Sequence, residues 1–150
     1  GVPAAFIAFL WSLHHMVKIV GAWTGGRLTD RLGSKPVILT ALCLYGAIYL
    51  ALGAFSSAVV LVPVFIAYGA SIGLLEPAEG AWVACLSTSG ARGTAYGAYN
   101  AVKGFAVLPA SVMFGYVWKY QGTFAAFGMG AALAFVGATT LMFVRDRTRP

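Results

Sequence analysis

The sequence predicts an all-α integral membrane protein with about five transmembrane helices. Three observations carry this prediction: hydrophobic residues make up 60% of the 150 positions, charged residues only 9%, and the apolar residues fall into long runs. Mean hydropathy is +0.84, far above the balance of a soluble domain. Four acidic and ten basic residues are too few to cover the surface of a soluble fold of this length. Lipid is therefore the expected solvent for most of the surface.

The apolar runs lie at approximately 2–24, 36–55, 59–86, 94–118 and 123–144, within a single transmembrane domain that covers 1–150. Each is close to the roughly 20 residues that cross a hydrocarbon core about 30 Å thick. The runs lack the in-and-out alternation of a membrane β-barrel, whereas helices satisfy their own backbone hydrogen bonds in lipid. Helices are therefore expected throughout.

The first two runs differ in their polar content. The run at 2–24 contains His14, His15 and Lys18. The run at 36–55 carries no charge, and Pro36 stands where a proline fits the first turn of a helix. The second run is therefore the least ambiguous span.

The last three runs include both charged and uncharged spans. The run at 59–86 continues past Glu76 and Glu79, which makes it long enough to tilt. The run at 94–118 contains Asn100 and Lys103 and is expected to bend at Pro109. The run at 123–144 is uncharged and is followed by an arginine-rich tail.

Lysine and arginine gather in alternate connections between the runs. One set holds seven basic residues, namely Arg27, Arg31, Lys35, Arg92, Arg145, Arg147 and Arg149, and the other set holds only Lys119. Basic residues accumulate on the cytoplasmic side of membrane proteins. The asymmetry predicts a protein of the cytoplasmic (inner or plasma) membrane with a cytoplasmic C-terminus. It also accounts for the net charge of +6 without nucleic acid as a partner.

The connection after the first run reads GRLTDRLGSK over 26–35 and is expected to form a short charged turn. Gly26 is expected to permit close packing where the first helix ends, and Gly33 to adopt positive φ in the reversal. Asp30 suits the positive N-terminal end of a neighbouring helix. Arg31 and Lys35 suit acidic groups or lipid phosphates.

This connection resembles the signature loop of the major facilitator superfamily, G-x-L-x-D-R-x-G-[RK]-[RK], of which that family carries a degenerate copy between its eighth and ninth helices. It departs from the pattern at Ser34 and matches at Gly26, Leu28, Asp30, Arg31, Gly33 and Lys35. The resemblance implies that these six residues form a conformational latch, which engages the other half of a transporter in one of its alternating states.

Two further stretches resemble the same superfamily. The stretch RGTAYG, with Arg92, Gly93 and Gly97, is similar to the start of the eleventh helix in bacterial members, and EPAE at 76–79 is similar to the end of the tenth. The resemblance then implies the C-terminal part of the protein, helices eight to twelve of a partial six-helix bundle, with the N-terminal half missing. It also implies a permease, an antiporter or symporter, that moves a small-molecule substrate by alternating access without catalysis or a cofactor.

Polar residues inside the runs are the candidate site, because such residues are costly in a bilayer. They are His14, Lys18, Glu76, Glu79, Asn100 and Lys103. Counted from the cytoplasmic helix ends, the two lysines and Glu79 lie about 10–12 Å deep, and His14 and Glu76 about 16 Å deep. We expect Glu79 to neighbour Lys18, Lys103 or both, and Glu76 to neighbour His14 or His15.

Three interpretations of these charges stay open. Alternating ion pairs would load and release a proton, because a buried carboxylate takes up a proton more readily when it loses its cation. A static network would instead only hold the helices together. In a third interpretation, a polytopic membrane enzyme or accessory subunit uses His14, Glu76 and Glu79 for catalysis or metal binding, although the sequence has no HExxH motif or nucleophile elbow. No metal site is expected. Tyr68 and Tyr99 are further candidates for a cavity wall.

Overall fold

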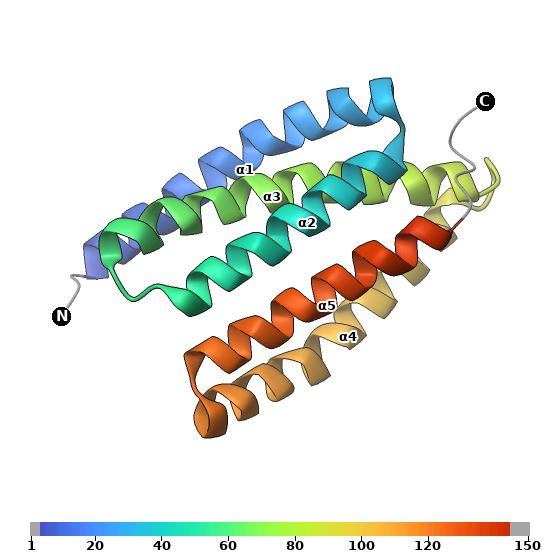
Figure 1. Cartoon of the computed structure of the whole chain (residues 1–150). Helices are drawn as coiled ribbons and strands as arrows, with labels where there is room; N and C mark the ends of the chain where they lie inside the picture. Colours follow the sequence, from blue (N-terminus) through green and yellow to red (C-terminus); the bar gives the residue numbers. More distant parts are fainter. Residues whose placement is uncertain (1–3, 145–150) are drawn as a thin grey trace.

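The computed structural model describes residues 4–144, which form five α-helices (Figure 1). These are α1 (Ala4–Leu32), α2 (Ser34–Ala54), α3 (Ala58–Leu86), α4 (Arg92–Gln121) and α5 (Thr123–Phe143). All five are long and apolar enough to cross a membrane, so the predicted all-α membrane fold is confirmed. The tail that carries Arg145, Arg147 and Arg149 lies outside the described residues.

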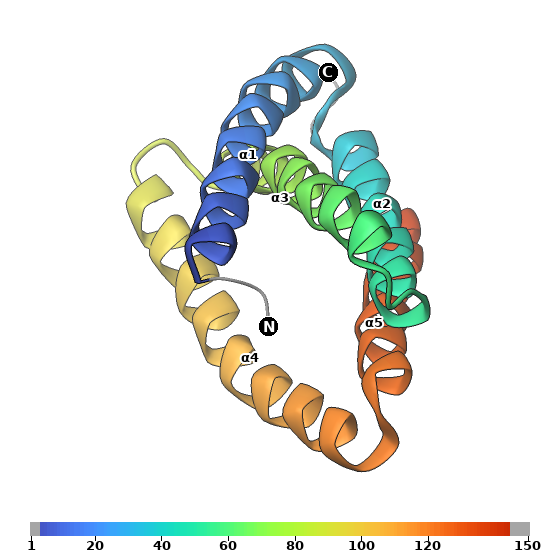
Figure 2. The ribbon, with the colours of Figure 1, turned by 90° about the vertical axis from the view of Figure 1, so that its left-hand side faces the viewer.

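Helices α1, α3, α2 and α5 pack side by side in that order, and α4 makes fewer contacts with them. Helix α3 packs along both α1 and α2, and α5 packs along α2. Val37 and Ile38 of α2 are buried together with Ala78 and Trp82 of α3. Helix α4 pairs with α5 as a hairpin, and Figure 2 shows it standing apart from α1 over much of its length. No residue of α4 is buried, so this helix presents most of its surface outward from this part of the protein.

Glycines bring α1 and α3 into backbone contact. A Cβ atom added to Gly69 would stand 2.6 Å from the carbonyl oxygen of His14, and one added to Gly25 would stand 2.9 Å from the Cα atom of Leu74. Missing side chains let helix backbones approach this closely in membranes. The glycines of α4 at positions 93 and 97 have nothing within 4 Å of such a Cβ among the described residues, so they serve no comparable contact there.

The segment 26–35 is helical rather than a turn, which corrects the sequence prediction. Helix α1 continues to Leu32 and α2 begins at Ser34, so Gly33 alone separates them. As predicted, Gly33 has positive φ, at 87°. The prediction that Gly26 packs closely at a helix end is wrong, because the helix continues and none of the residues 4–144 places an atom within 4 Å of its Cβ position. Gly25 makes the close approach instead, since one residue further along a helix turns the side-chain direction by about 100°.

Candidate functional site

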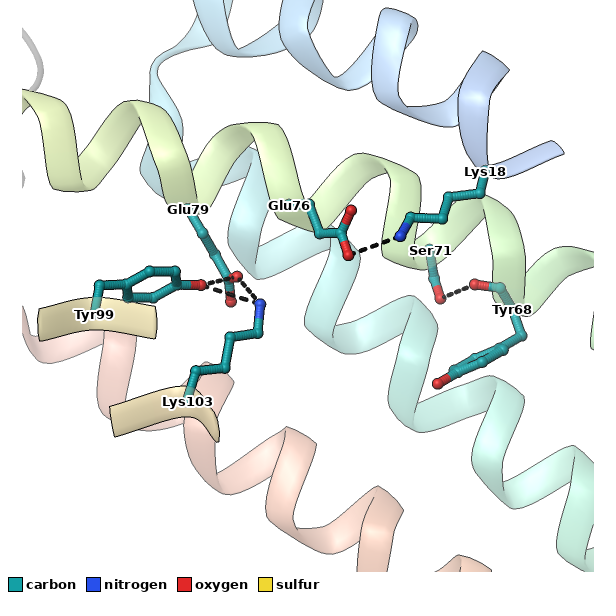
Figure 3. Close-up of polar contacts among 7 residues, drawn as sticks. All are labelled: Lys18, Tyr68, Ser71, Glu76, Glu79, Tyr99 and Lys103. Atoms are coloured by element: carbon teal, nitrogen blue, oxygen red, sulfur yellow. Dashed lines mark hydrogen bonds and ion pairs between the residues drawn. The ribbon is translucent and has the colours of Figure 1, made fainter. Parts of the chain in front are cut away.

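Lys18 of α1 and Glu76 of α3 form an ion pair in the middle of their helices (Figure 3), with 2.9 Å between Nζ and Oε1. The packing of α1 on α3 sets this pair. Gly73 lies level with Lys18, because the nearest atom to a Cβ on Gly73 is the Lys18 carbonyl oxygen. Glu76 follows three residues later, about 4.5 Å along the axis, within reach of a flexible four-carbon lysine stem.

The predicted contact between Glu76 and a histidine is wrong. The His14 ring is buried at 5% exposure, and its Nδ1 lies 3.2 Å from the carbonyl oxygen of Phe65. His14 stands level with Gly69, whose Cβ position lies against the His14 backbone. Glu76 comes seven residues after Gly69, about 10 Å further along α3. His15 points to another side of α1 and packs edge-on against Trp11.

A second ion pair joins α3 to α4. Lys103 lies 2.8 Å from Glu79, measured from Nζ to Oε2, which confirms one of the predicted partners of Glu79. The Tyr99 hydroxyl donates a hydrogen bond to the same carboxylate oxygen and accepts one from Lys103 at 3.1 Å. The three side chains form a closed cluster between the helices (Figure 3). The other predicted partner of Glu79, Lys18, is paired with Glu76 instead.

The sequence indicated Tyr99 only as a candidate for a cavity wall, not as a member of the charge network. Its signal was the spacing of four residues to Lys103, which puts both side chains on one face of a helix. Tyr96, one turn earlier, donates a hydrogen bond of 2.6 Å to the carbonyl oxygen of Gly80 and so adds a second polar bridge from α4 to α3. Asn100 does not join the network; its amide donates to the backbone of Tyr96.

The two ion pairs lie side by side on α3 and are accessible. Glu76 and Glu79 are three residues apart, which places their Cβ atoms roughly 5–6 Å from each other. Side-chain exposure is 29% for Lys18, 44% for Glu76, 48% for Lys103 and 23% for Glu79. A cavity of about 240 Å³ borders Glu79 and Tyr99. Its other lining residues are apolar: Ile38, Trp82, Val83, Leu86 and Leu141.

The segment 26–35 contributes a different contact. The Lys35 ammonium donates hydrogen bonds to the backbone carbonyl oxygens of Met142 at 3.0 Å and Val144 at 2.6 Å. Lys35 therefore caps the C-terminal end of α5, where a cation is favoured by the helix dipole, whereas the sequence suggested an acidic group or a lipid phosphate. Asp30 and Arg31 are exposed near the end of α1.

The remaining residues singled out in the sequence lie at exposed positions. Leu28 is 40% exposed on α1. Arg92, Gly93 and Gly97 are exposed in the first two turns of α4. Helix α4 begins at Arg92, so the stretch that resembles a helix start does begin a helix.

Five membrane-length helices, with two ion pairs between them, define this chain as part of an integral membrane protein. A family profile of the Major Facilitator Superfamily matches residues 1–150. The chain belongs to the Major Facilitator Superfamily.

Two curated relatives agree with this assignment. The chain is 34% identical over 119 residues to the uncharacterized MFS-type transporter MJ1317 of Methanocaldococcus jannaschii, a match that covers 79% of this chain and 30% of that protein. It is 27% identical over 146 residues to the probable galactarate/D-glucarate transporter GudP of Bacillus subtilis, covering 91% of this chain and 32% of GudP. The chain thus spans about a third of the length of these relatives.

Proposed function

We propose that the full-length protein is a secondary active transporter that moves a small solute across the cytoplasmic membrane by alternating access. The observation that carries the proposal is the pair of accessible Lys–Glu contacts on α3, in a chain of this family. Transporters of this kind bind solute and coupling ion near the bilayer midplane. The missing N-terminal half would supply the other wall of the solute pathway.

Proton coupling through Glu76 and Glu79 is part of this proposal. Glu76 faces Lys18 from α1, and Glu79 faces Lys103 and Tyr99 from α4. Other titratable side chains on these three helices include Tyr68, Tyr96, His14 and His15. If a change of state separates a lysine from its glutamate, the carboxylate loses its counter-ion and takes up a proton. Asn100 lies one helical turn before Lys103 on the same face of α4.

The segment 26–35 is proposed to act as the latch. Exposure of Asp30 and Arg31 near the end of α1 supports this role, because both side chains are free to meet the other half of the transporter. Gly33 supports it by allowing α1 and α2 to reverse direction through one residue. In the proposed orientation, the segment 26–35, the start of α4 at Arg92 and the C-terminus all face the cytoplasm.

The test is solute uptake by purified full-length protein in liposomes with an imposed pH gradient. Galactarate and D-glucarate, which appear in the name of GudP, are the first solutes of the panel. We expect gradient-driven accumulation by the wild type, and uptake without a response to the gradient in Glu76→Gln. Lys119→Gln, at the far end of α4, is the control and is expected to behave as wild type. An unchanged pH response in Glu76→Gln would remove Glu76 from the coupling mechanism.

The competing interpretation, a membrane enzyme or accessory subunit that uses His14, Glu76 and Glu79, finds no support in the geometry. His14 lies level with Gly69, about 10 Å along the helix from Glu76. Within residues 4–144, no group of three His, Cys, Asp or Glu side chains is placed to hold a metal ion. Both curated relatives are named as transporters.

A further inference from the structure

Lys18 and Lys103 lie within membrane-length helices, and each is paired with one carboxylate of the protein itself. Lys18 comes from α1 and Lys103 from α4, on different sides of α3 (Figure 3). Among the described residues, the Lys18 ammonium donates to Glu76 alone, although an ammonium carries three donors. Both lysine side chains are more than a quarter exposed, so a solute in the bundle can reach them.

We propose that the solute is a small organic anion whose carboxylates bind Lys18 and Lys103, and that Glu76 and Glu79 occupy these lysines when the solute is absent. This inference rests on the proposed transport function and specifies the class of solute. The two lysines bind the solute carboxylates. The two glutamates compete for the lysines and keep the empty site electrically neutral.

The arrangement fits a solute with two carboxylates. The glutamates that occupy the lysines are one helical turn apart, with Cβ atoms roughly 5–6 Å from each other. A solute with two carboxylates can therefore replace the two glutamates, one at each ammonium group. The Tyr99 hydroxyl, which contacts both Glu79 and Lys103, can hydrogen-bond the solute once Glu79 is displaced.

The charge balance gives this inference a distinctive signature. Two lysines and two glutamates sum to zero, and the solute carboxylates must displace Glu76 and Glu79 to reach the lysines. Removing a lysine charge deletes an attraction, so it weakens binding of the anion. Removing a glutamate charge deletes a competitor and a repulsion, so it strengthens binding. If the ion pairs only held the helices together, removing either charge would break a pair. The lysine and glutamate variants would then change anion binding in the same direction.

The experiment measures solute binding to the purified full-length protein by isothermal titration calorimetry. The probes are galactarate and galactitol, which share a six-carbon polyhydroxyl chain and differ in ending in carboxylates or hydroxymethyl groups. We expect the wild type to bind galactarate at least about tenfold more tightly than galactitol, since hydrogen bonds to charged groups are worth about 1.5–3 kcal/mol.

The variants then separate the two explanations. Lys18→Gln and Lys103→Gln are expected to weaken galactarate binding by about tenfold or more, whereas Glu76→Gln and Glu79→Gln strengthen it. Lys119→Gln is the charge-matched control and leaves the affinity unchanged. Each variant is compared as a monodisperse protein, and if a lysine variant fails to fold, the sign of the effect in Glu76→Gln still decides.

Two results would overturn the inference: equal affinity for galactarate and galactitol, or weaker galactarate binding in the glutamate variants. These outcomes differ from failure of the proposed function. Uptake of galactitol by a protein that does not distinguish the two probes would refute the anion site and support transport. Galactarate binding without uptake of any solute in liposomes would support the anion site and refute transport.

Discussion

Replacing Gly73 with alanine is expected to push α1 away from α3. An added Cβ atom would stand 2.8 Å from the Cα atom of Gly21 and 2.9 Å from the backbone nitrogen of Ala22. Non-bonded carbon atoms prefer about 3.5–4.0 Å. The nearest atoms, including the carbonyl oxygen of Lys18, all belong to the backbone, so no side-chain rotation relieves the clash. The two helices must separate by about 1 Å.

The cost follows from this separation. Forcing an extra carbon into a well-packed interface typically costs about 1–3 kcal/mol. Alanine also has a higher helix propensity than glycine, by up to about 1 kcal/mol, which offsets part of the loss. Gly137→Ala is the matched control, because it adds the same group to a helix interior and, among the described residues, meets only a Leu42 methyl at 3.9 Å. The propensity gain cancels between the variants, so Gly73→Ala should be less stable than the control by about 1–3 kcal/mol.

The assay is SDS-induced unfolding of the full-length protein in mixed micelles, followed by tryptophan fluorescence. Equal free energies of unfolding for Gly73→Ala and Gly137→Ala would refute the argument that close backbone packing of α1 on α3 limits this position. The same substitution has a functional consequence. Because the Lys18 backbone rests on Gly73, Gly73→Ala also draws Lys18 away from Glu76, so galactarate binding should change in Gly73→Ala and stay unchanged in the control.

The remaining predictions concern helix ends and the bridge from α4. Gly33→Ala should lower the free energy of unfolding by about 1–3 kcal/mol, because its φ of 87° and ψ of 162° suit only glycine; stability equal to Gly137→Ala in the same SDS titration would contradict this. Lys35→Met removes two hydrogen bonds to the last carbonyls of α5, so hydrogen exchange in that turn should accelerate, while Lys35→Arg keeps it protected. Tyr96→Phe loses its hydrogen bond to α3 and should cost about 1 kcal/mol in SDS unfolding; an unchanged value would show that this bond does not hold α4.

The sequence predicted the pairing of charges only in part. It brought Glu79 together with Lys103, since both lie at similar depth from the same end of neighbouring helices, and the structure confirms that ion pair. The same depth argument placed Glu76 with a histidine, and the structure pairs it with Lys18. Depth alone failed there because α1 is longer than the first apolar run and extends to Leu32. The offset of one helix relative to its neighbour along their axes cannot be obtained by counting residues from the end of an apolar run.

The sequence by itself determined the five helices, the membrane as their solvent and the polar residues within them, because hydropathy and helical rise are properties of local sequence. Tertiary structure alone decided which of those polar groups meet. Lys18 and Glu76 are 58 positions apart, and Lys35 reaches carbonyls 107 and 109 positions away. The offset between α1 and α3 is fixed where glycine removes the side chain and backbones touch, and that contact depends on two distant segments at once.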